Sequence, residues 1–291
     1  MKCINTIKHS EQRRISVADF SWLCGPATNE KIFEKGKEFE ADFVILDLED
    51  GLALDLKQQG RNRVLAELKN NNPARYAVRI NYLADEQGIC DLQFFSRNKI
   101  APEYIIIPKF SHLRESEIVK EVLSPFQPKL KIIPVIESIK GLRFLRSATT
   151  IPDYITSFHF GAADFSLDMG FNPKKATLTK YKEELSFLCH ELNVPIIDSP
   201  YFNIDDLSGL QQDCITSKEL GYQGKIAIHP QQLASINSVF SLHHDEVNQA
   251  RNIVERHENE TIVKHNGEMT GPPFIKYAQN ILHSALTEKG K

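Results

Sequence analysis

Short apolar runs alternate along this chain with longer amphipathic stretches. The runs have four to six residues and are rich in β-branched side chains. They lie at residues 21–25, 43–48, 76–80, 104–108, 131–136, 156–160, 194–197 and 225–228. Polar positions do not alternate regularly within them, which is typical of parallel strands covered on both faces. We therefore expect eight buried parallel strands.

Helical periodicity fills most of the intervals between these runs. The expected helices lie at residues 30–39, 55–69, 115–123, 139–146, 178–192, 205–220 and 231–240. Eight strands alternating with helices predict a (β/α)8 barrel, and 291 residues suit one such domain. We place the barrel at residues 15–242.

Two further helical stretches follow the last strand and helix, at residues 243–258 and 272–287. The linker TIVKHNGEMTGPP between them is rich in turn-forming residues. This segment is too short to be a domain of its own. We expect residues 243–291 to form a C-terminal helical extension, either as outer helices or as a lid over a neighbouring subunit.

Charge and composition narrow the possible partners. The chain has 35 basic and 38 acidic residues and no polybasic block, which argues against nucleic-acid or membrane binding. MKCINTIKHSEQRR at the N-terminus lacks the apolar core of a signal peptide. An odd number of scattered cysteines without a CxxC pattern indicates reduced thiols and a cytoplasmic protein. The cysteines are Cys3, Cys24, Cys90, Cys189 and Cys214.

Polar side chains follow seven of the eight predicted strands. The carboxyl ends of parallel barrel strands share one rim, which is where active sites of this architecture lie. The rim residues are Asp47, Glu49, Asp50, Arg79, Asn81, Lys109, Glu137, Ser138, Asp164, Asp198, Ser199 and His229. Their convergence predicts a site.

Crowded carboxylates on this rim favour a divalent cation, because each raises the pKa of the others. Oxygen ligands without paired Cys or His favour Mg2+, or Mn2+, over zinc. We expect Glu137 and Asp164 to bind the metal directly. Asp47, Glu49 and Asp50 are then expected to hold metal-bound waters from the second shell, with Lys109 bridging the acids.

Arg79 is the expected partner of an anionic substrate, since a guanidinium binds a carboxylate with two parallel hydrogen bonds. Backbone N–H groups of Gly161, Ala162 and Ala163 are expected to bind the other end of that substrate. A 2-oxo acid suits this arrangement, because its carbonyl and carboxylate oxygens chelate a metal that polarises the carbonyl. The site thus predicts making or breaking a C–C bond, with Arg79, Glu49 and Asp50 as catalytic residues.

Each of these residues also has a structural interpretation. Asp164 is then a helix N-cap, Glu137 a surface acid that opens a helix, and residues 47–51 a solvated turn. Arg79 is then one partner of a salt bridge inside the rim.

Several segments together resemble one family. They are DFVILDLEDGLALDLKQQGR, YAVRIN, IIIPK, IIPVIES, FHFGAADFSLDMG, IIDSPYFNIDDLSGL and GYQGKIAIHPQQLASIN. In this order, and over about residues 20–280, they resemble the citrate lyase β-subunit-like branch of the HpcH/HpaI aldolase family. That branch includes malyl-CoA, β-methylmalyl-CoA and citramalyl-CoA lyases.

The resemblance implies a TIM barrel in homotrimers or hexamers, with magnesium bound by Glu137 and Asp164. It implies that Arg79 holds the oxo-acid carboxylate. The implied reaction splits a 3-hydroxyacyl-CoA ester into acetyl-CoA or propionyl-CoA and a small 2-oxo acid, glyoxylate or pyruvate.

Two positions depart from the family pattern. Gly271 stands where relatives often have an Asp in the C-terminal lid, and Leu23–Pro26 replaces a Phe-Val-Pro-Gly-like stretch. These departures leave four alternatives to the CoA-ester lyase. They are a malyl-CoA thioesterase, an aldolase of free 2-oxo acids, a citrate lyase β-like subunit acting on an acyl-carrier-protein thioester, and a weakly catalytic ligand-binding homologue.

Overall fold

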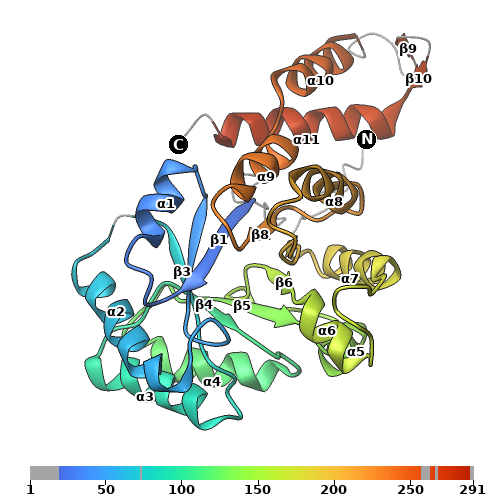
Figure 1. Ribbon diagram of the computed structural model, residues 1–291. Coiled ribbons are helices and arrows are strands. Elements are labelled where there is room, and N and C mark those ends of the chain that lie inside the picture. The colour runs from blue at the N-terminus through green and yellow to red at the C-terminus, as the bar shows by residue number, and fades with distance from the viewer. Residues whose placement is uncertain (1–19, 73, 257–262, 266–267, 289–291) are drawn as a thin grey trace, which may run out of the picture.

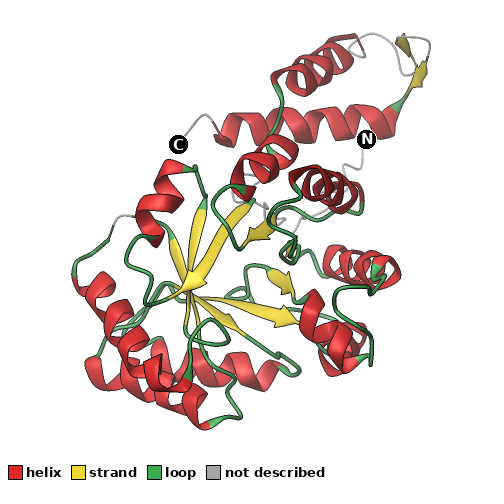
Figure 2. Ribbon diagram, in the orientation of Figure 1, coloured by secondary structure: helices red, strands yellow, loops and turns green. Residues whose placement is uncertain are grey.

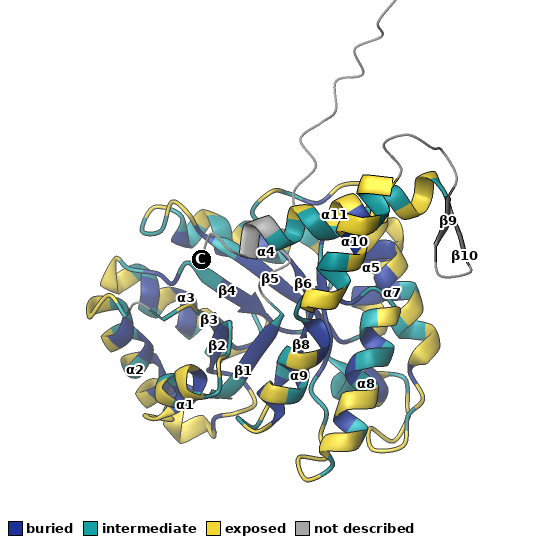
Figure 3. Ribbon diagram, turned by 90° about the horizontal axis from the view of Figure 1, so that it is seen from above, coloured by how far each residue is buried: buried dark blue, intermediate teal, exposed yellow. Residues whose placement is uncertain are grey.

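The computed structural model describes residues 20–72, 74–256, 263–265 and 268–288, with a barrel of parallel strands inside a ring of helices (Figures 1 and 2). Residues 15–19 of the predicted barrel and Cys3 lie outside the described residues. The expected fold class, a (β/α)8 barrel, is confirmed. Figure 3 shows its buried strands enclosed by helices whose outer surfaces are exposed.

Eight strands pair in the order β7-β6-β5-β4-β3-β2-β1-β8. Each lies within one of the predicted apolar runs or ends one residue beyond it. They are β1 (Ser21–Pro26), β2 (Phe43–Asp47), β3 (Tyr76–Arg79), β4 (Tyr104–Ile107), β5 (Lys131–Ile136), β6 (Phe158–Phe160), β7 (Ile196–Ile197) and β8 (Lys225–Ala227).

Helices follow the strands and cover the outside of the barrel. They are α1 (Ile32–Glu38), the 3₁₀ turn η1 (Leu54–Leu56), α2 (Lys57–Lys69), α3 (Glu86–Asn98), α4 (Leu113–Leu123), α5 (Ile139–Ser147), α6 (Ala162–Asp168), α7 (Thr179–Glu191), α8 (Leu207–Glu219) and α9 (Gln232–Phe240). Two of them, α3 and α6, were not predicted. The short helix α6 matters most, because it contains Asp164.

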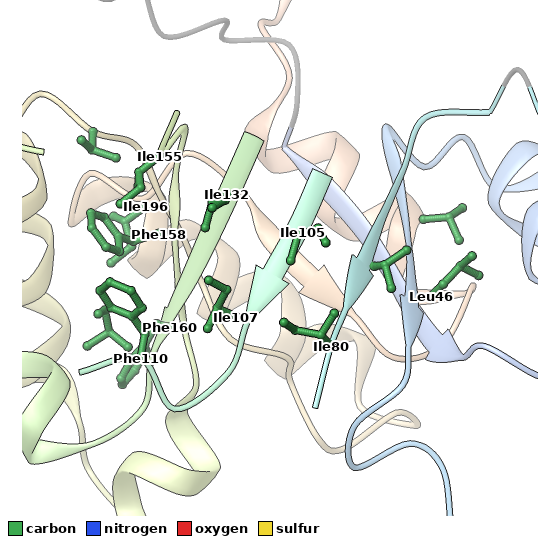
Figure 4. Close-up of a cluster of buried hydrophobic side chains, with 14 of the residues drawn as sticks. Leu46, Ile80, Ile105, Ile107, Phe110, Ile132, Ile155, Phe158, Phe160 and Ile196 are labelled. Carbon is green, nitrogen blue, oxygen red and sulfur yellow. The ribbon is translucent and has the colours of Figure 1, made fainter. Parts of the chain in front are cut away.

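Alternating side chains of the strands fill two apolar layers. The outer layer lies between strands and helices and includes Leu46, Ile80, Ile105 and Phe158 (Figure 4). The inner layer fills the barrel interior, where Trp22 stacks on Phe43 at 4.1 Å between ring centroids. The runs are apolar throughout because both faces of each strand are buried.

The barrel closes between β7 and β8 with little regular pairing. Asp198 and Lys225 form an isolated parallel bridge there. The Asp198 N–H donates to Gly224 O at 2.8 Å, and the Ile226 N–H donates to Asp198 O at 3.0 Å. We call this closure, with the side chains of Asp198 and Lys225, the seam.

Two helices follow the barrel, α10 (His244–Arg256) and α11 (Pro272–Glu288), and they pack against each other beside α8 and α9 (Figure 1). A short hairpin, β9 (Val263–His265) and β10 (Glu268–Thr270), lies between them where only turns were expected. Gly267 lies outside the described residues. No helix in the described part of the chain is long and apolar enough to cross a membrane.

Candidate active site

The carboxylate of Asp47, at the end of β2, accepts four hydrogen bonds at the rim. Arg79, at the end of β3, donates from Nε and Nη2, both at 2.7 Å. The backbone N–H groups of Glu49 and Gly51 donate at 2.9 and 2.7 Å. Burial alone raises the pKa of Asp47, but Arg79 and the backbone donors outweigh burial and hold it below its ordinary value. Asp47 is therefore a charged anchor for the loop that follows it.

Glu49 lies on this loop and is also buried, with two cations beside it. Lys109 Nζ donates to its Oε1 at 2.9 Å, and Arg79 Nη1 lies 3.5 Å from its Oε2. Burial nevertheless raises the pKa of Glu49, and the charge of Asp50 adds to that rise. Glu49 can thus hold a proton closer to neutral pH than an ordinary Glu.

Glu137 follows β5 and is only 3% exposed. One of its oxygens accepts a hydrogen bond from the Lys109 N–H at 2.5 Å, which the left-handed backbone of Lys109 (φ 53°) presents. Burial, followed by the charges of Glu49 and Asp164, raises the pKa of Glu137 to about 8. A Cβ at Gly161 would collide with Glu137 Oε2, so only glycine fits beside this carboxylate.

Asp164 lies in the first turn of α6, whose N-cap is Gly161. Asp164 is therefore not the N-cap, although an acid in a first turn is favoured by the helix dipole. Burial, followed by the charge of exposed Asp50, raises its pKa. Of the backbone donors predicted for substrate, the Gly161 N–H already donates to Ile136 O at 3.1 Å. The N–H groups of Ala162 and Ala163 lie where a helix leaves amides without intrahelical acceptors.

These acids fit a hard cation. In the described residues, no Lys, Arg or His side chain forms an ion pair with Glu137 or Asp164. Burial and the charges of neighbouring acids raise the pKa of both carboxyl groups. Within the same part of the chain, no three acidic, His or Cys side chains gather closely enough to hold a metal by themselves. Two carboxylates, with water and substrate oxygens completing the shell, are a usual set for Mg2+.

Arg79 is arranged differently from the expectation. Its Nε and Nη2 already bind Asp47 side by side, so this edge of the guanidinium is not open to a substrate carboxylate. The Nη1 group faces Glu49, and about a fifth of the side chain, 22%, is exposed. Asp47 is engaged on the protein side as well, because its four hydrogen bonds come from Arg79 and from the backbone of Glu49 and Gly51.

Asp198 does not join the rim, although it was grouped with the rim residues. Its carboxylate is 0% exposed and binds Lys225, Lys182 and Ser217 on the side of the barrel covered by α7 and α8. The rim itself brings together the remaining predicted carboxylates and both expected cations, namely Asp47, Glu49, Asp50, Arg79, Lys109, Glu137 and Asp164.

Sequence reasoning missed Lys57. Its ammonium group reaches the acidic loop from α2 and donates to Leu48 O and Glu49 O. The available signal was a lysine one helical turn before Arg61, on the face of α2 that turns inward.

Comparisons with known proteins identify the family of this chain. The profile of the HpcH/HpaI aldolase/citrate lyase family matches residues 21–230. Human mitochondrial citramalyl-CoA lyase is 24% identical over 289 residues, covering 91% of this chain and 85% of that protein. A (3S)-malyl-CoA thioesterase of Cereibacter sphaeroides is 28% identical over 220 residues, covering 74% and 75%.

A solved structure shares the fold. The protein CitE from Mycobacterium tuberculosis, in complex with magnesium, acetoacetate and coenzyme A, superposes with a TM-score of 0.74. It is 23% identical, and the match covers 92% of this chain and 98% of that one. At this identity the likeness supports the barrel.

Proposed function

The chain belongs to the HpcH/HpaI aldolase/citrate lyase family, and we propose that it is a Mg2+-dependent carbon–carbon lyase. Its substrate is a 3-hydroxyacyl-CoA ester of the malyl-CoA, methylmalyl-CoA or citramalyl-CoA type. Its products are an acyl-CoA and a 2-oxo acid. The observation that carries the proposal is the pair Glu137 and Asp164, two acids on the rim without a cationic partner among the described residues.

Glu137 and Asp164 are the proposed metal ligands. When bound, Mg2+ supplies Lewis acidity at the oxygen that becomes the oxo-acid carbonyl. Lys109 holds Glu137 through its N–H and Glu49 through its ammonium group, so the acids keep their spacing. Arg79 Nη1, beside Glu49, and the first amides of α6 are the proposed contacts of the substrate carboxylate.

Cleavage needs two proton transfers. A base removes the proton of the 3-hydroxyl group, the C2–C3 bond breaks, and its electron pair passes to the thioester as an enolate. An acid then protonates that enolate to give the acyl-CoA. Glu49 and Asp50 are the proposed groups, because Glu49 has a raised pKa and Asp50 is exposed beside it.

A thioesterase is the second candidate. The malyl-CoA thioesterase relative supports it, as does Gly271, which cannot move a proton from the lid. In this reaction water adds to the thioester carbonyl and CoA leaves as a thiol. The same rim would hold the dicarboxylic end of the substrate.

Other features of the expected function remain predictions. The M. tuberculosis structure contains magnesium and coenzyme A, which supports the proposal that this chain binds a metal ion and a CoA ester. The acyl-carrier-protein alternative, the homotrimer or hexamer and the cytoplasmic compartment stay predictions, and the human relative is mitochondrial by name.

The test follows two products at once. The purified chain is mixed with Mg2+ and malyl-, methylmalyl- or citramalyl-CoA, and oxo acid and free CoA are measured separately. We expect oxo acid without free CoA, lost with EDTA and in Asp164→Ala. Asp205→Ala, which removes an exposed acid of the β7–α8 loop, is the matched control and should keep full activity.

Other outcomes separate the alternatives. Free CoA without oxo acid would replace the lyase with the thioesterase. Turnover only of an acyl-carrier-protein thioester would make the chain a citrate lyase β-like subunit. Binding of Mg2+ and pyruvate without any product would make it a ligand-binding homologue.

A further inference from the structure

The loop from Leu48 to Gly51 carries two acids toward a rim that is already acidic. Glu49 is only 4% exposed. Burial raises the pKa of Glu49 and of Glu137, and a neighbouring charge adds to each rise, that of Asp50 at Glu49 and that of Glu49 at Glu137. Lys109 and Arg79 attract the Glu49 side chain, but both are partly exposed. These two contacts hold the side chain of Glu49, so the backbone of the loop needs contacts of its own.

Two groups fix that backbone from opposite sides. On the barrel side, the Asp47 carboxylate accepts from the N–H groups of Glu49 and Gly51. On the helix side, the ammonium group of Lys57 donates to Leu48 O at 2.7 Å and to Glu49 O at 2.6 Å. Donors and acceptors of the same short segment are thus both occupied.

Lys57 is itself held by a buried polar chain. Its third hydrogen bond goes to Asn81 Oδ1 at 2.6 Å. Asn81 donates its backbone and side-chain N–H groups to Asp91 Oδ2 at 2.7 and 2.8 Å. Arg61, one turn after Lys57 on α2, donates to Asp91 Oδ1 at 2.8 Å. The chain connects α2 and α3 to the ends of β2 and β3.

The three acceptors of the Lys57 ammonium are neutral oxygens, and its residue is only 8% exposed. A buried ammonium group that binds backbone carbonyls costs solvation without the gain of a close ion pair. A fold needing only a filled space at this position would take an apolar side chain. The ammonium group of Lys57 instead fixes the conformation of the loop through its hydrogen bonds to the backbone.

We infer that Lys57 is a positioning residue for the reaction, acting through Glu49. It holds the carbonyls of Leu48 and Glu49 so that the Glu49 carboxylate meets Lys109 and Arg79 at the rim. The inference rests on the proposed function for its kinetic consequence, but the position of the loop is independent of it.

The kinetic test compares Lys57→Met with Lys120→Met. Lys120, on α4, also donates from its ammonium group to a backbone carbonyl, Leu130 O at 3.2 Å, but it does so at the amino-terminal end of β5, opposite the rim. In Lys57→Met we expect kcat to fall by about 10–100-fold, the usual cost of losing an outer-shell partner, with KM changed less than threefold. Lys120→Met should keep kcat per folded molecule. Wild-type kcat in folded Lys57→Met, or equal losses in both variants, would overturn the inference.

A second readout does not depend on turnover. Crystal structures of the wild type and Lys57→Met are compared at residues 48–51, and we expect Glu49 Oε1 to leave Lys109 Nζ, which it meets at 2.9 Å. An unmoved loop would overturn the inference even if the wild type cleaves no thioester. If Lys57→Met does not fold, Lys57→Gln, which is shorter but keeps an N–H donor, takes its place in both tests.

Discussion

Two buried groups of charges lie in this barrel, one on the rim and one at the seam, and they are built oppositely. At the seam, Asp198 accepts from Lys225, Lys182 and Ser217, and Lys225 also pairs with Asp213. Two lysines face two aspartates there. On the rim, acids outnumber cations, and Glu137 and Asp164 have no ion-pair partner among the residues described.

The pKa shifts follow this difference. Burial alone raises the pKa of Asp198, but Lys225 and Lys182 reverse it and bring the pKa down to about 2. Burial raises the pKa of Glu137 to about 8, and neighbouring acids add to the rise. At similar burial, the two lysines stabilise the charged form of Asp198, whereas Glu137 has no ion-pair partner among the described residues. We regard the balanced cluster as structural and the acidic one as the site.

The largest effect is expected from a substitution that breaks the ion pairs of the seam. Lys225→Met leaves Asp198 buried with one fewer cation, and such a loss costs about 3–5 kcal/mol of unfolding free energy. Urea unfolding followed by circular dichroism measures it, with exposed Lys129→Met as the control. Activity per folded molecule should stay unchanged; a stable Lys225→Met with impaired catalysis would reverse our assignment of the two clusters.

The next effect concerns the rim. Glu137→Gln keeps the shape but removes a proposed metal ligand, so activity should fall at least about 100-fold. Because the wild-type carboxylate is buried without a cation, the metal-free variant should be as stable as the wild type or more so. Activity assays with thermal unfolding in EDTA check both parts. A variant that keeps its activity would exclude Glu137 as a ligand.

A third effect is the dependence of metal-free stability on pH. The unfolded Glu137 carboxyl releases its proton near its ordinary pKa of 4.5, whereas the folded one keeps it until about pH 8. The folded state therefore binds more protons in this window, and stability falls as pH rises through it. Mg2+ replaces that proton, so it should raise the melting temperature more at pH 8.5 than at pH 6.

The contribution of the seam to stability should change with pH in the opposite direction. Asp198 has an ordinary pKa of 3.8 and a folded pKa of about 2, so its contribution is full above pH 4 and is lost on acidification toward pH 2. Scanning fluorimetry of the wild type and Glu137→Gln across both windows separates the two groups. A Glu137→Gln variant that keeps the alkaline slope would assign that slope to another residue.

The smallest effect is expected at an exposed pair. Arg146 donates from Nε and Nη2 to Glu184 at 2.6 and 2.9 Å, a geometry as good as that of Arg79 and Asp47. Water screens this pair, so Arg146→Met should leave the melting temperature within experimental error. A clear drop would mean that geometry rather than burial sets the worth of these contacts.

The sequence was sufficient for the strands and for most of the rim. Strands covered on both faces produce apolar runs that stand out from their surroundings, and polar residues at their ends mark the rim. It was insufficient for Asp198, because a run that is apolar on both faces conceals which residues point inward. In β7 Ile197 points into the barrel, so its neighbour Asp198 points out; Asp47, Arg79 and Glu137 have the inward parity.

Other features could not be predicted from the pattern of apolar and polar residues, each for a different reason. Helix α6 is short and begins at Gly161 and two alanines, so it carries little amphipathic signal. Lys57 works through backbone carbonyls, whose position depends on how the loop folds. The commitment of Arg79 to Asp47 likewise depends on the register of β2 against β3.

The seam also has a consequence for how the barrel is made. All other pairings in the barrel join strands that follow one another in the chain, whereas β8, the last strand, pairs with β1, the first. At the seam β8 also meets β7. Closure therefore waits until the ribosome has released β8, and until then β1 has an open edge. Until that moment Asp198 lacks Lys225, and an unfinished chain carries an uncovered strand edge, which makes partly folded chains prone to aggregation.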